Sequence, residues 1–239
     1  IGHTRWATHG GPCEANAHPI TTGRVSVVHN GIVENYQALR DRLRERGYSP
    51  TSETDTECIA GLMNLALDDG LDPEQALISV LAQLEGAFAF AALVAGREDS
   101  LFCARNHSAL AIGYGDDATY VCSDALALAP LTQRISYLDD GDLAVLTTGG
   151  AKVFDGGRRS VARPVHMASF EAANDGKAEY QHYMDKEIHE QPAVIEKILA
   201  TFRDEKTAAL RLPKLPFDLA TVTKITIIAC GTSYCAAMI

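Results

Sequence analysis

The stretch that decides the fold reads AFAFAALVA (residues 87–95), SLFCAR (100–105), ALAIGYG (109–115), ATYVCS (118–123), DLAVLTT (142–148) and AKVFD (151–155). Short apolar runs of this kind, separated by turn residues, predict a series of strands. The pair Gly149-Gly150 between the last two runs predicts a hairpin turn. A series of strands that follows a group of helices favours an α+β layered domain over a doubly wound one.

Three helices are predicted upstream of these strands. Residues 34–46 and 55–68 carry apolar side chains at helical spacing. Gly47 directly follows the first of them and is suited to end it. Asp72 followed by Pro73 predicts the start of the third helix, because Asp caps a helix and Pro is tolerated in its first turn.

The last third of the chain has a different character. Periodicity is lost over residues 156–178, which predicts a domain boundary. Residues 179–205 predict a helix that breaks at Pro192, and residues 210–223 predict an extended connector. Residues 224–239 predict a buried strand, a Gly turn and the start of a helix. Because such a strand needs the rest of a sheet, and because the first residue is not Met, we expect the chain to be part of a longer protein.

Composition excludes several classes of function. The 239 residues carry a net charge of −10, which argues against binding to nucleic acid or to an anionic membrane surface. Hydrophobic residues make up 46% of the chain, enough to build a core. No apolar run reaches the roughly 18 residues that a transmembrane helix needs, and the first ten residues lack the apolar segment of a signal peptide.

The cysteines and histidines do not predict a metal site. The six cysteines match no zinc pattern and lie mostly in apolar runs, which predicts reduced thiols in a cytoplasmic protein. His3, His9, His18 and His29 have spacings that match no helical or compact metal-binding pattern. We therefore expect neither a metal ion nor an organic cofactor.

Arg5 and Asp55 are a candidate pair for binding an α-amino acid. A guanidinium group binds a carboxylate through two parallel hydrogen bonds, and Thr8 and His9 add donors beside it. The carboxylate of Asp55 suits an ammonium group. Each residue also has a structural explanation, because Arg5 can pair with an acidic side chain and Asp55 can interact with the dipole of a helix.

The β-branched run 25–28 predicts a short strand between two loops. Asn30-Gly31 follows this run and allows two interpretations. Asn-Gly is typical of a hairpin turn. Alternatively, the amide of Asn30 and a neighbouring backbone N–H form an oxyanion hole, with Gly31 permitting close approach. A similar ambiguity holds for Thr232 and Ser233, which either cap a helix or bind a phosphate at its N-terminus.

Eight strings together resemble one family. They are HTRWATHG (3–10), NAHP (16–19), VHNGIVEN (28–35), ETDTE (53–57), SDALAL (123–128), DDGDLA (139–144), HYMDKEIHEQP (182–192) and ACGTSY (229–234). In these strings the chain resembles the glutamine–fructose-6-phosphate aminotransferases, which make glucosamine 6-phosphate. The resemblance extends over the whole chain.

The resemblance implies a fold and a domain order. Residues 1–165 would be a class II glutamine amidotransferase domain with the N-terminal-nucleophile fold, an α/β/β/α sandwich of two antiparallel sheets, here incomplete. Residues 166–222 would be a linker with helices. Residues 223–239 would begin a sugar isomerase domain that binds fructose 6-phosphate. The family implies a homodimer for the full-length protein.

The resemblance also implies residue roles. Arg5, Thr8 and His9 would bind the α-carboxylate of L-glutamine, and Asp55 its α-ammonium group. Asn30 and Gly31 would form the oxyanion hole, and Trp6 would couple glutamine binding to the passage of ammonia. Thr232 and Ser233 would bind the sugar phosphate.

The chain departs from the family pattern at both ends. The family begins with a nucleophilic Cys, and the segment that carries it is absent from this sequence. Cys13 has no recognisable general base beside it, so we expect this chain alone to have no glutaminase activity. Two alternatives remain, which are a related aminotransferase for another keto sugar phosphate and a non-catalytic module that binds glutamine or a sugar phosphate.

Overall fold

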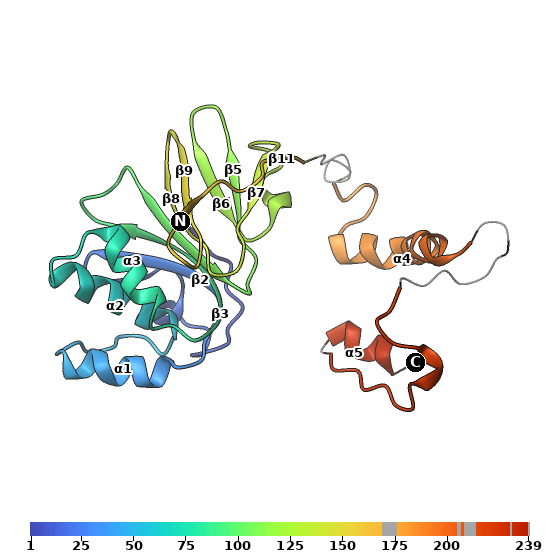
Figure 1. The fold of residues 1–239 in the computed structure, drawn as a ribbon, viewed down its shortest axis with the longest axis horizontal. Helices are drawn as coiled ribbons and strands as arrows, with labels where there is room; N and C mark the ends of the chain where they lie inside the picture. Colours follow the sequence, from blue (N-terminus) through green and yellow to red (C-terminus); the bar gives the residue numbers. More distant parts are fainter. Residues whose placement is uncertain (169–175, 205–206, 208–213, 230, 239) are drawn as a thin grey trace. The chain divides into compact units, whose positions relative to one another are not determined.

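The computed structural model describes residues 1–168, 176–204, 207, 214–229 and 231–238. The chain divides into two compact units, Ile1–Asn174 and Asp175–Ile239 (Figure 1). No helix in the described part of the chain is both long enough and apolar enough to span a membrane.

Two antiparallel sheets form the centre of the first unit. The larger sheet has the strand order β1 (Ile20–Thr22), β2 (Val25–Val33), β3 (Gly86–Val94), β4 (Leu101–Asn106), β8 (Leu143–Thr147), β9 (Gly150–Phe154) and β10 (Ser160–Val161). The smaller sheet has the order β11 (His166–Met167), β7 (Arg134–Tyr137), β5 (Ala111–Tyr114) and β6 (Thr119–Cys122). The predicted hairpin is confirmed, because Thr147 pairs with Gly150 at the end of β8 and β9.

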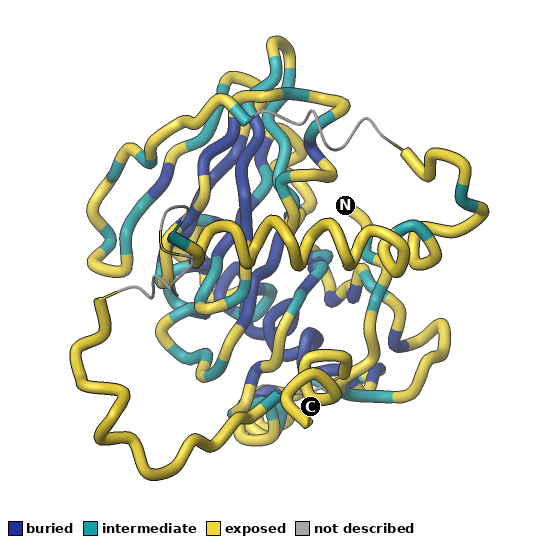
Figure 2. Tube along the Cα trace, turned by 90° about the vertical axis from the view of Figure 1, so that its right-hand side faces the viewer, coloured by how far each residue is buried: buried dark blue, intermediate teal, exposed yellow. Residues whose placement is uncertain are grey.

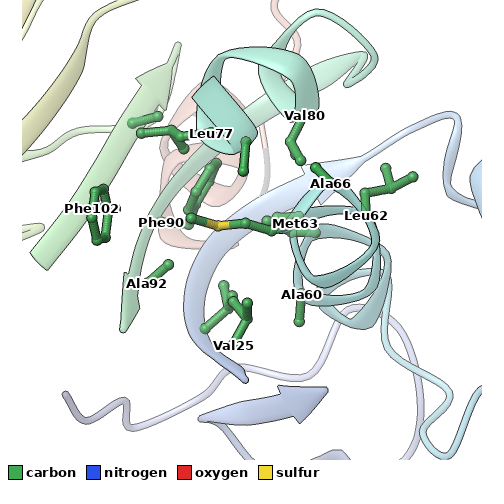
Figure 3. Close-up of a cluster of buried hydrophobic side chains, with 14 of the residues drawn as sticks. Val25, Ala60, Leu62, Met63, Ala66, Leu77, Val80, Phe90, Ala92 and Phe102 are labelled. Carbon is green, nitrogen blue, oxygen red and sulfur yellow. The ribbon is translucent and has the colours of Figure 1, made fainter. Parts of the chain in front are cut away.

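Three helices cover one face of the larger sheet. They are α1 (Tyr36–Glu45), α2 (Thr56–Asp68) and α3 (Pro73–Leu81). Met63 of α2, Leu77 of α3 and Phe90 of β3 are buried together between the two layers (Figure 3). Burial of side chains of this size stabilises the fold by about 1.5–3 kcal/mol each, so this cluster is the main core of the unit.

Successive side chains of β3 alternate between two clusters, and the second of these clusters lies between the sheets. Phe88 and Phe90 belong to the cluster under the helices, whereas Ala89 and Ala91 belong to the cluster between the sheets. Successive side chains of a strand point to opposite faces, so β3 contributes to both clusters. Ile112 of the smaller sheet completes the inner core.

The outer face of the smaller sheet carries little cover. A third, small cluster joins Ala111, Leu128 and Ile135, and Leu128 comes from the 3-10 helix η2 (Ala125–Leu128). The layers are thus α/β/β, with η2 as the only helix of the described residues packed on that outer face. The predicted α+β class is confirmed, and the buried segments of both sheets are visible in Figure 2.

The helix boundaries follow the predicted signals. Asp72 accepts hydrogen bonds from the backbone of Glu74 and Gln75, and Gln75 bonds back to the Asp72 backbone, which makes a capping box. Gly47 has φ +81°, a conformation that glycine adopts without steric cost. These three helices therefore begin and end close to where local sequence predicts them.

The N-terminal segment differs from the prediction. Residues 1–19 contain a short 3-10 helix, η1 (Glu14–Asn16), and the strand predicted at residues 25–28 extends to Val33. A strand that was not predicted, β1, pairs with it through Ile20 and Val27. Asn30-Gly31 therefore lies inside a strand, and the hairpin-turn interpretation is wrong.

The second unit contains α4 (Tyr183–Phe202), η4 (Leu219–Thr221) and α5 (Gly231–Ala237). The helix break predicted at Pro192 is wrong, because α4 continues through it. Met184, Ile188, Ile195 and Leu199 recur at helical spacing on both sides of the proline, so one continuous helix keeps them on one side.

The buried strand predicted at the start of residues 224–239 is also wrong for this structure. Residues 224–229 form no strand, and Ile228 is 94% exposed. A strand needs a hydrogen-bonded neighbour, and no described segment pairs with these residues. Residues 210–213 of the predicted connector and Cys230 lie outside the described residues. The bounds of the three predicted domains, 1–165, 166–222 and 223–239, stay predictions.

Candidate functional site

A cavity of about 170 Å³ lies in the first unit, where three segments meet. It is lined by His3, Arg5, Trp6, Thr8, His9 and His18 from the N-terminal segment, by His29, Asn30 and Gly31 from β2, and by Thr54, Asp55 and Thr56 from the start of α2. The seven residues predicted for glutamine binding, the oxyanion hole and ammonia coupling all contribute to this lining. The structure therefore brings together residues that are up to 50 positions apart in sequence, Arg5 and Asp55 being the extremes.

Asn30 is oriented by His3. The backbone N–H of Arg5 donates to His3 Nδ1 over 2.9 Å, so the ring proton sits on Nε2 and donates to Asn30 Oδ1 over 2.7 Å. Once Oδ1 faces His3, the amide nitrogen of Asn30 is the group left to donate. No other described residue bonds to this nitrogen, so it remains available to an oxygen atom of a ligand.

Gly31 is required by the backbone. Its φ is +109°, and a Cβ atom there would lie 2.1 Å from the carbonyl oxygen of Ala87. Any other residue would force β2 and β3 apart at this point. The close approach at Gly31 is thus made to the neighbouring strand, and its role in an oxyanion hole stays a prediction.

Arg5 makes no ion pair with any acidic side chain of the described residues. Its Nη2 donates to the carbonyls of His9 (2.8 Å) and Gly10 (3.0 Å), and its Nη1 donates to Gly11 (3.2 Å). These carbonyls are neutral, so they leave the positive charge uncompensated. The explanation of Arg5 as a partner of an acidic residue is therefore wrong, and its charge is available to an anion at the cavity.

Asp55 is 3% exposed and is held by β2. Its Oδ2 accepts a hydrogen bond of 2.8 Å from the backbone N–H of Val33. It occupies the position before the first turn of α2, but its side chain makes no capping hydrogen bond. Its Oδ1 lies 4.0 Å from His9 Nδ1 and makes no closer polar contact with any residue that the structure describes. One carboxylate oxygen therefore remains for a ligand, opposite in charge to Arg5.

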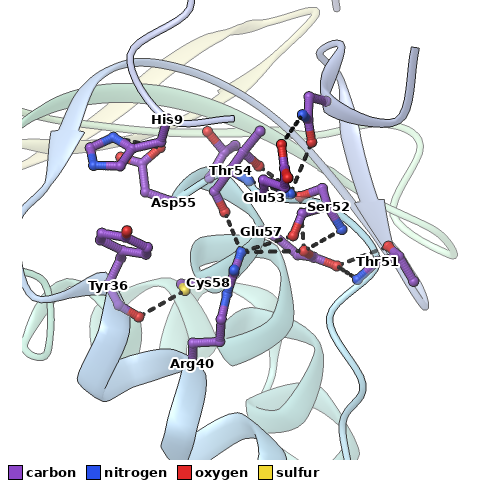
Figure 4. A network of polar contacts seen from close by, with 12 residues as sticks. His9, Tyr36, Arg40, Thr51, Ser52, Glu53, Thr54, Asp55, Glu57 and Cys58 are labelled. Atoms are coloured by element: carbon purple, nitrogen blue, oxygen red, sulfur yellow. Dashed lines mark hydrogen bonds and ion pairs between the residues drawn. The ribbon is translucent and has the colours of Figure 1, made fainter. Parts of the chain in front are cut away.

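Glu57 fixes the loop that leads to Asp55, a role that was not predicted (Figure 4). Its Oε1 accepts from the Thr51 backbone (2.6 Å) and from Tyr48 Oη (2.7 Å), and its Oε2 accepts from the Ser52 backbone (2.8 Å). Burial raises the pKa of this carboxyl, but these hydrogen bonds outweigh burial, and the net pKa is lowered. The signal in the sequence was an acidic residue placed on a helix whose other residues are mostly apolar.

Two histidines line the cavity beside Thr56, and of these His29 is buried and His18 is half-buried. His18 Nε2 and His29 Nδ1 both lie within hydrogen-bond distance of Thr56 Oγ1, at 3.2 and 3.0 Å. Burial, followed by the positive charges nearby, lowers the pKa of His18 to about 4, and burial lowers that of His29 to about 4. Both rings are therefore neutral at pH 7 and add no positive charge to that of Arg5.

The remaining predicted site residues differ in position. Trp6 is 91% exposed and Thr8 is also exposed, so both lie at the rim of the cavity. Thr232 and Ser233 lie in the first turn of α5 in the second unit and are exposed. Within the described residues, no group of three or more His, Cys, Asp or Glu is arranged to hold a metal ion, and the absence of a metal stays a prediction.

The sequence is similar to known amidotransferases. A model of the glutamine amidotransferase domain family matches residues 3–130. The glutamine–fructose-6-phosphate aminotransferase (isomerizing) of Zymomonas mobilis is 50% identical over 239 residues, and that of Gluconobacter oxydans is 44% identical. Each alignment covers 100% of this chain and 39% of the relative, so the chain spans well under half the length of these relatives.

Two solved structures share the fold. The glutamine phosphoribosylpyrophosphate amidotransferase from B. subtilis superimposes with a TM-score of 0.55 at 23% identity. The allosteric regulatory enzyme of purine biosynthesis superimposes with a TM-score of 0.54 at 26% identity. Each match covers 64% of this chain and 34% of the other chain, and it supports the N-terminal-nucleophile type of sandwich.

Proposed function

The chain belongs to the glutamine amidotransferase domain family, and from that premise we propose that its cavity binds L-glutamine through both charged α-groups. Arg5, assisted by Thr8 and His9, binds the α-carboxylate, and Asp55 binds the α-ammonium group. One observation carries this proposal. An uncompensated guanidinium and a buried carboxylate with a free oxygen line the same cavity of about 170 Å³.

In the same proposal, Asn30 and Gly31 stabilise the oxygen of the glutamine side chain during attack. The orientation of Asn30 supports this role, since its oxygen is held by His3 and its nitrogen is free to donate. A donor of this kind aimed at a developing oxyanion contributes a factor of about 10²–10³ to the rate. Trp6 at the rim is proposed to couple glutamine binding to the passage of ammonia.

For the longer protein we propose transfer of the released ammonia to fructose 6-phosphate, which yields glucosamine 6-phosphate and glutamate in a homodimer. The names of the relatives from Zymomonas and Gluconobacter support this acceptor. Thr232 and Ser233 are proposed as phosphate ligands of the acceptor site. A related enzyme for another keto sugar phosphate and a non-catalytic binding module are the alternatives.

The chain of 239 residues is proposed to bind glutamine without hydrolysing it. Among the described residues that line the cavity there is no cysteine. Cys13 is exposed, and burial raises the pKa of Cys58 to about 11. Attack on an amide needs a thiolate at the substrate, and these observations support the absence of a thiolate from the described lining of the cavity.

Calorimetric titration of the chain with L-glutamine tests the binding site. Asp55→Asn retains an acceptor for the Val33 N–H but loses the charge, so we expect the affinity to fall about tenfold to 100-fold. Asp68→Asn, at the exposed end of the same helix, is the matched control and is expected to bind normally. Equal affinities of the wild type and Asp55→Asn would remove Asp55 from the site.

An assay of ammonia release from glutamine tests the absence of hydrolysis. We expect no turnover above background for the chain alone. Turnover that is abolished by Cys13→Ala would contradict the proposal and would make Cys13 the nucleophile.

A further inference from the structure

The two charged walls of the cavity belong to segments that are far apart in sequence. Arg5 lies in the N-terminal loop, and Asp55 lies at the start of α2. A ligand that carries both α-charges can bind Arg5 and Asp55 at the same time only if the distance between these two side chains matches the distance between its own charged groups. The structure therefore needs a link between the loops, and the polar groups of Asn16 and Glu53 supply one.

Asn16 is 1% exposed, and both polar atoms of its side chain bond within this link. Its Nδ2 donates to the carbonyl of Gly11 (3.0 Å) and to Glu53 Oε2 (3.0 Å). Its Oδ1 accepts from the backbone N–H of Glu53 over 2.9 Å. Glu53 Oε2 also accepts from the backbone N–H of Gly11 over 3.3 Å. Asn16 and Glu53 together thus form a clip, which we call the Asn16–Glu53 clip.

The clip acts on the groups that hold Arg5. The carbonyl of Gly11 accepts one bond from Asn16 Nδ2 and another from Arg5 Nη1, at 3.0 and 3.2 Å. On the other side, Glu53 stands two positions before Asp55 on the same loop, as Figure 4 shows. A short series of hydrogen bonds therefore connects the guanidinium to the segment that carries the carboxylate.

Packing at Gly10 makes this connection tight. Gly10 has φ +77°, and a Cβ atom there would lie 2.7 Å from Asn16 Nδ2 and 2.8 Å from Glu53 Cβ. The backbone of the Arg5 loop thus rests directly on both members of the clip. Sliding of one loop against the other would break hydrogen bonds of a side chain that has no access to water.

We propose that Asn16 and Glu53 are positioning residues that set the separation of Arg5 and Asp55, and that they make the cavity selective for ligands that carry both α-charges. This inference rests on the proposed glutamine site and adds the origin of its selectivity. A ligand with only one of the two charges contacts only one wall. Its affinity does not depend on the separation and is insensitive to the clip.

The test compares three ligands on five proteins by calorimetric titration. The ligands are L-glutamine, 4-carbamoylbutanoate, which lacks the α-ammonium group, and 4-aminobutanamide, which lacks the α-carboxylate. The proteins are the wild-type chain, Asn16→Ala, Glu53→Ala, Glu53→Gln and Glu45→Ala. Glu45 is an exposed residue of α1 and serves as the matched control for removing a carboxylate.

Asn16→Ala and Glu53→Ala are expected to lose about tenfold in glutamine affinity, whereas the affinities for the two analogues change less than about twofold. Glu53→Gln is expected to restore most of the glutamine affinity, because both bonds go to one oxygen, Oε2, and an amide oxygen can accept them. Glu45→Ala is expected to match the wild type. An equal loss for all three ligands, or an unchanged glutamine affinity in Glu53→Ala, would overturn the proposal.

Hydrogen exchange separates failure of the clip from failure of the proposed function. The backbone amides of Gly11 and Glu53 are expected to exchange faster in Asn16→Ala than in the wild type, in a variant whose cooperative unfolding is retained. If the wild-type chain binds no glutamine, the proposed function and its selectivity are both wrong. Unchanged exchange at the two amides would show that the clip does not hold the loops together, whatever the ligand.

Discussion

Phe90, in the unit of residues 1–174, is 1% exposed, whereas Phe217, in the unit of residues 175–239, is 55% exposed. The contrast extends to whole segments. The first unit has three clusters of buried apolar side chains, and none of the described residues of the second unit is buried. In Figure 2 the strands of the first unit are largely buried, and α4 is exposed along its length.

The difference teaches that an apolar pattern in the sequence does not by itself produce a buried core. α4 carries apolar residues at helical spacing, and residues 225–228 are almost continuously apolar, yet both remain exposed. An apolar side chain stabilises a fold only when another surface removes it from water. In the first unit the helices and the smaller sheet provide that surface on both faces of the larger sheet.

Truncation of the two phenylalanines gives the largest expected effect. Phe90→Ala is expected to lower the free energy of unfolding by about 3–5 kcal/mol, because it removes buried surface and leaves a cavity. Phe217→Ala is expected to change it by less than about 0.5 kcal/mol. Urea unfolding followed by far-UV circular dichroism measures both values. Similar losses for the two variants would break the comparison between the units.

Removal of the buried carboxylate of Glu57 gives the second-largest expected effect on the free energy of unfolding. Glu57→Ala leaves the hydroxyl of Tyr48 and the backbone N–H groups of Thr51 and Ser52 without their acceptor. We expect a loss of about 2–3 kcal/mol in the free energy of unfolding. Glu187→Ala, on the exposed surface of α4, is the matched change in the second unit and is expected to stay within about 0.5 kcal/mol.

The pH dependence of the same carboxyl sharpens this prediction. The pKa of Glu57 is lowered in the folded state, so its contribution is fully present above its ordinary pKa of about 4.3 and is lost as the pH falls through the lowered value. His18 and His29, with pKa values lowered to about 4, already reduce stability between about pH 6.5 and 4. In that range, the free energy of unfolding of Glu57→Gln should therefore change with pH as steeply as that of the wild type. Below that range, Glu57→Gln should lose less stability than the wild type.

The helix caps give the smallest effect. Asp72→Ala removes the capping box of α3 and is expected to cost about 1 kcal/mol of stability. His182 occupies the equivalent position before α4 and makes no capping hydrogen bond with its side chain. His182→Ala is therefore expected to have no measurable effect in the same denaturation experiment. A loss in His182→Ala as large as that in Asp72→Ala would show that the ends of α4 are held more firmly than the structure indicates.

Local signals predicted much of the first unit. The helix start at Asp72, the end at Gly47 and the hairpin at Gly149-Gly150 depend on residues within a few positions of one another. Where a more distant partner decides, an interpretation based on local signals was wrong. Asn30-Gly31 is typical of a turn, yet pairing with Ala89 and Phe88 of β3 keeps it extended.

The sequence indicated which chemical groups a candidate site could use, but it did not indicate how they are arranged in space. The residue types at Arg5 and Asp55 indicate a pair of charges for an amino acid, but their approach depends on folding. Asn16 and Glu53 are separated by 37 residues, so no local pattern in the sequence links them. Glu57 was overlooked for the same reason, since its role depends on a loop that folds back onto α2.

By itself, the sequence determined most helices and strands of the first unit and the kinds of group available to a ligand, because hydrogen bonds and side-chain periodicity within one element involve near neighbours. Only the tertiary structure decided which apolar segments are buried and which polar groups share a cavity. Both depend on contacts between distant segments, and such contacts form only where the gain from burial and hydrogen bonding exceeds the entropy lost in bringing the segments together.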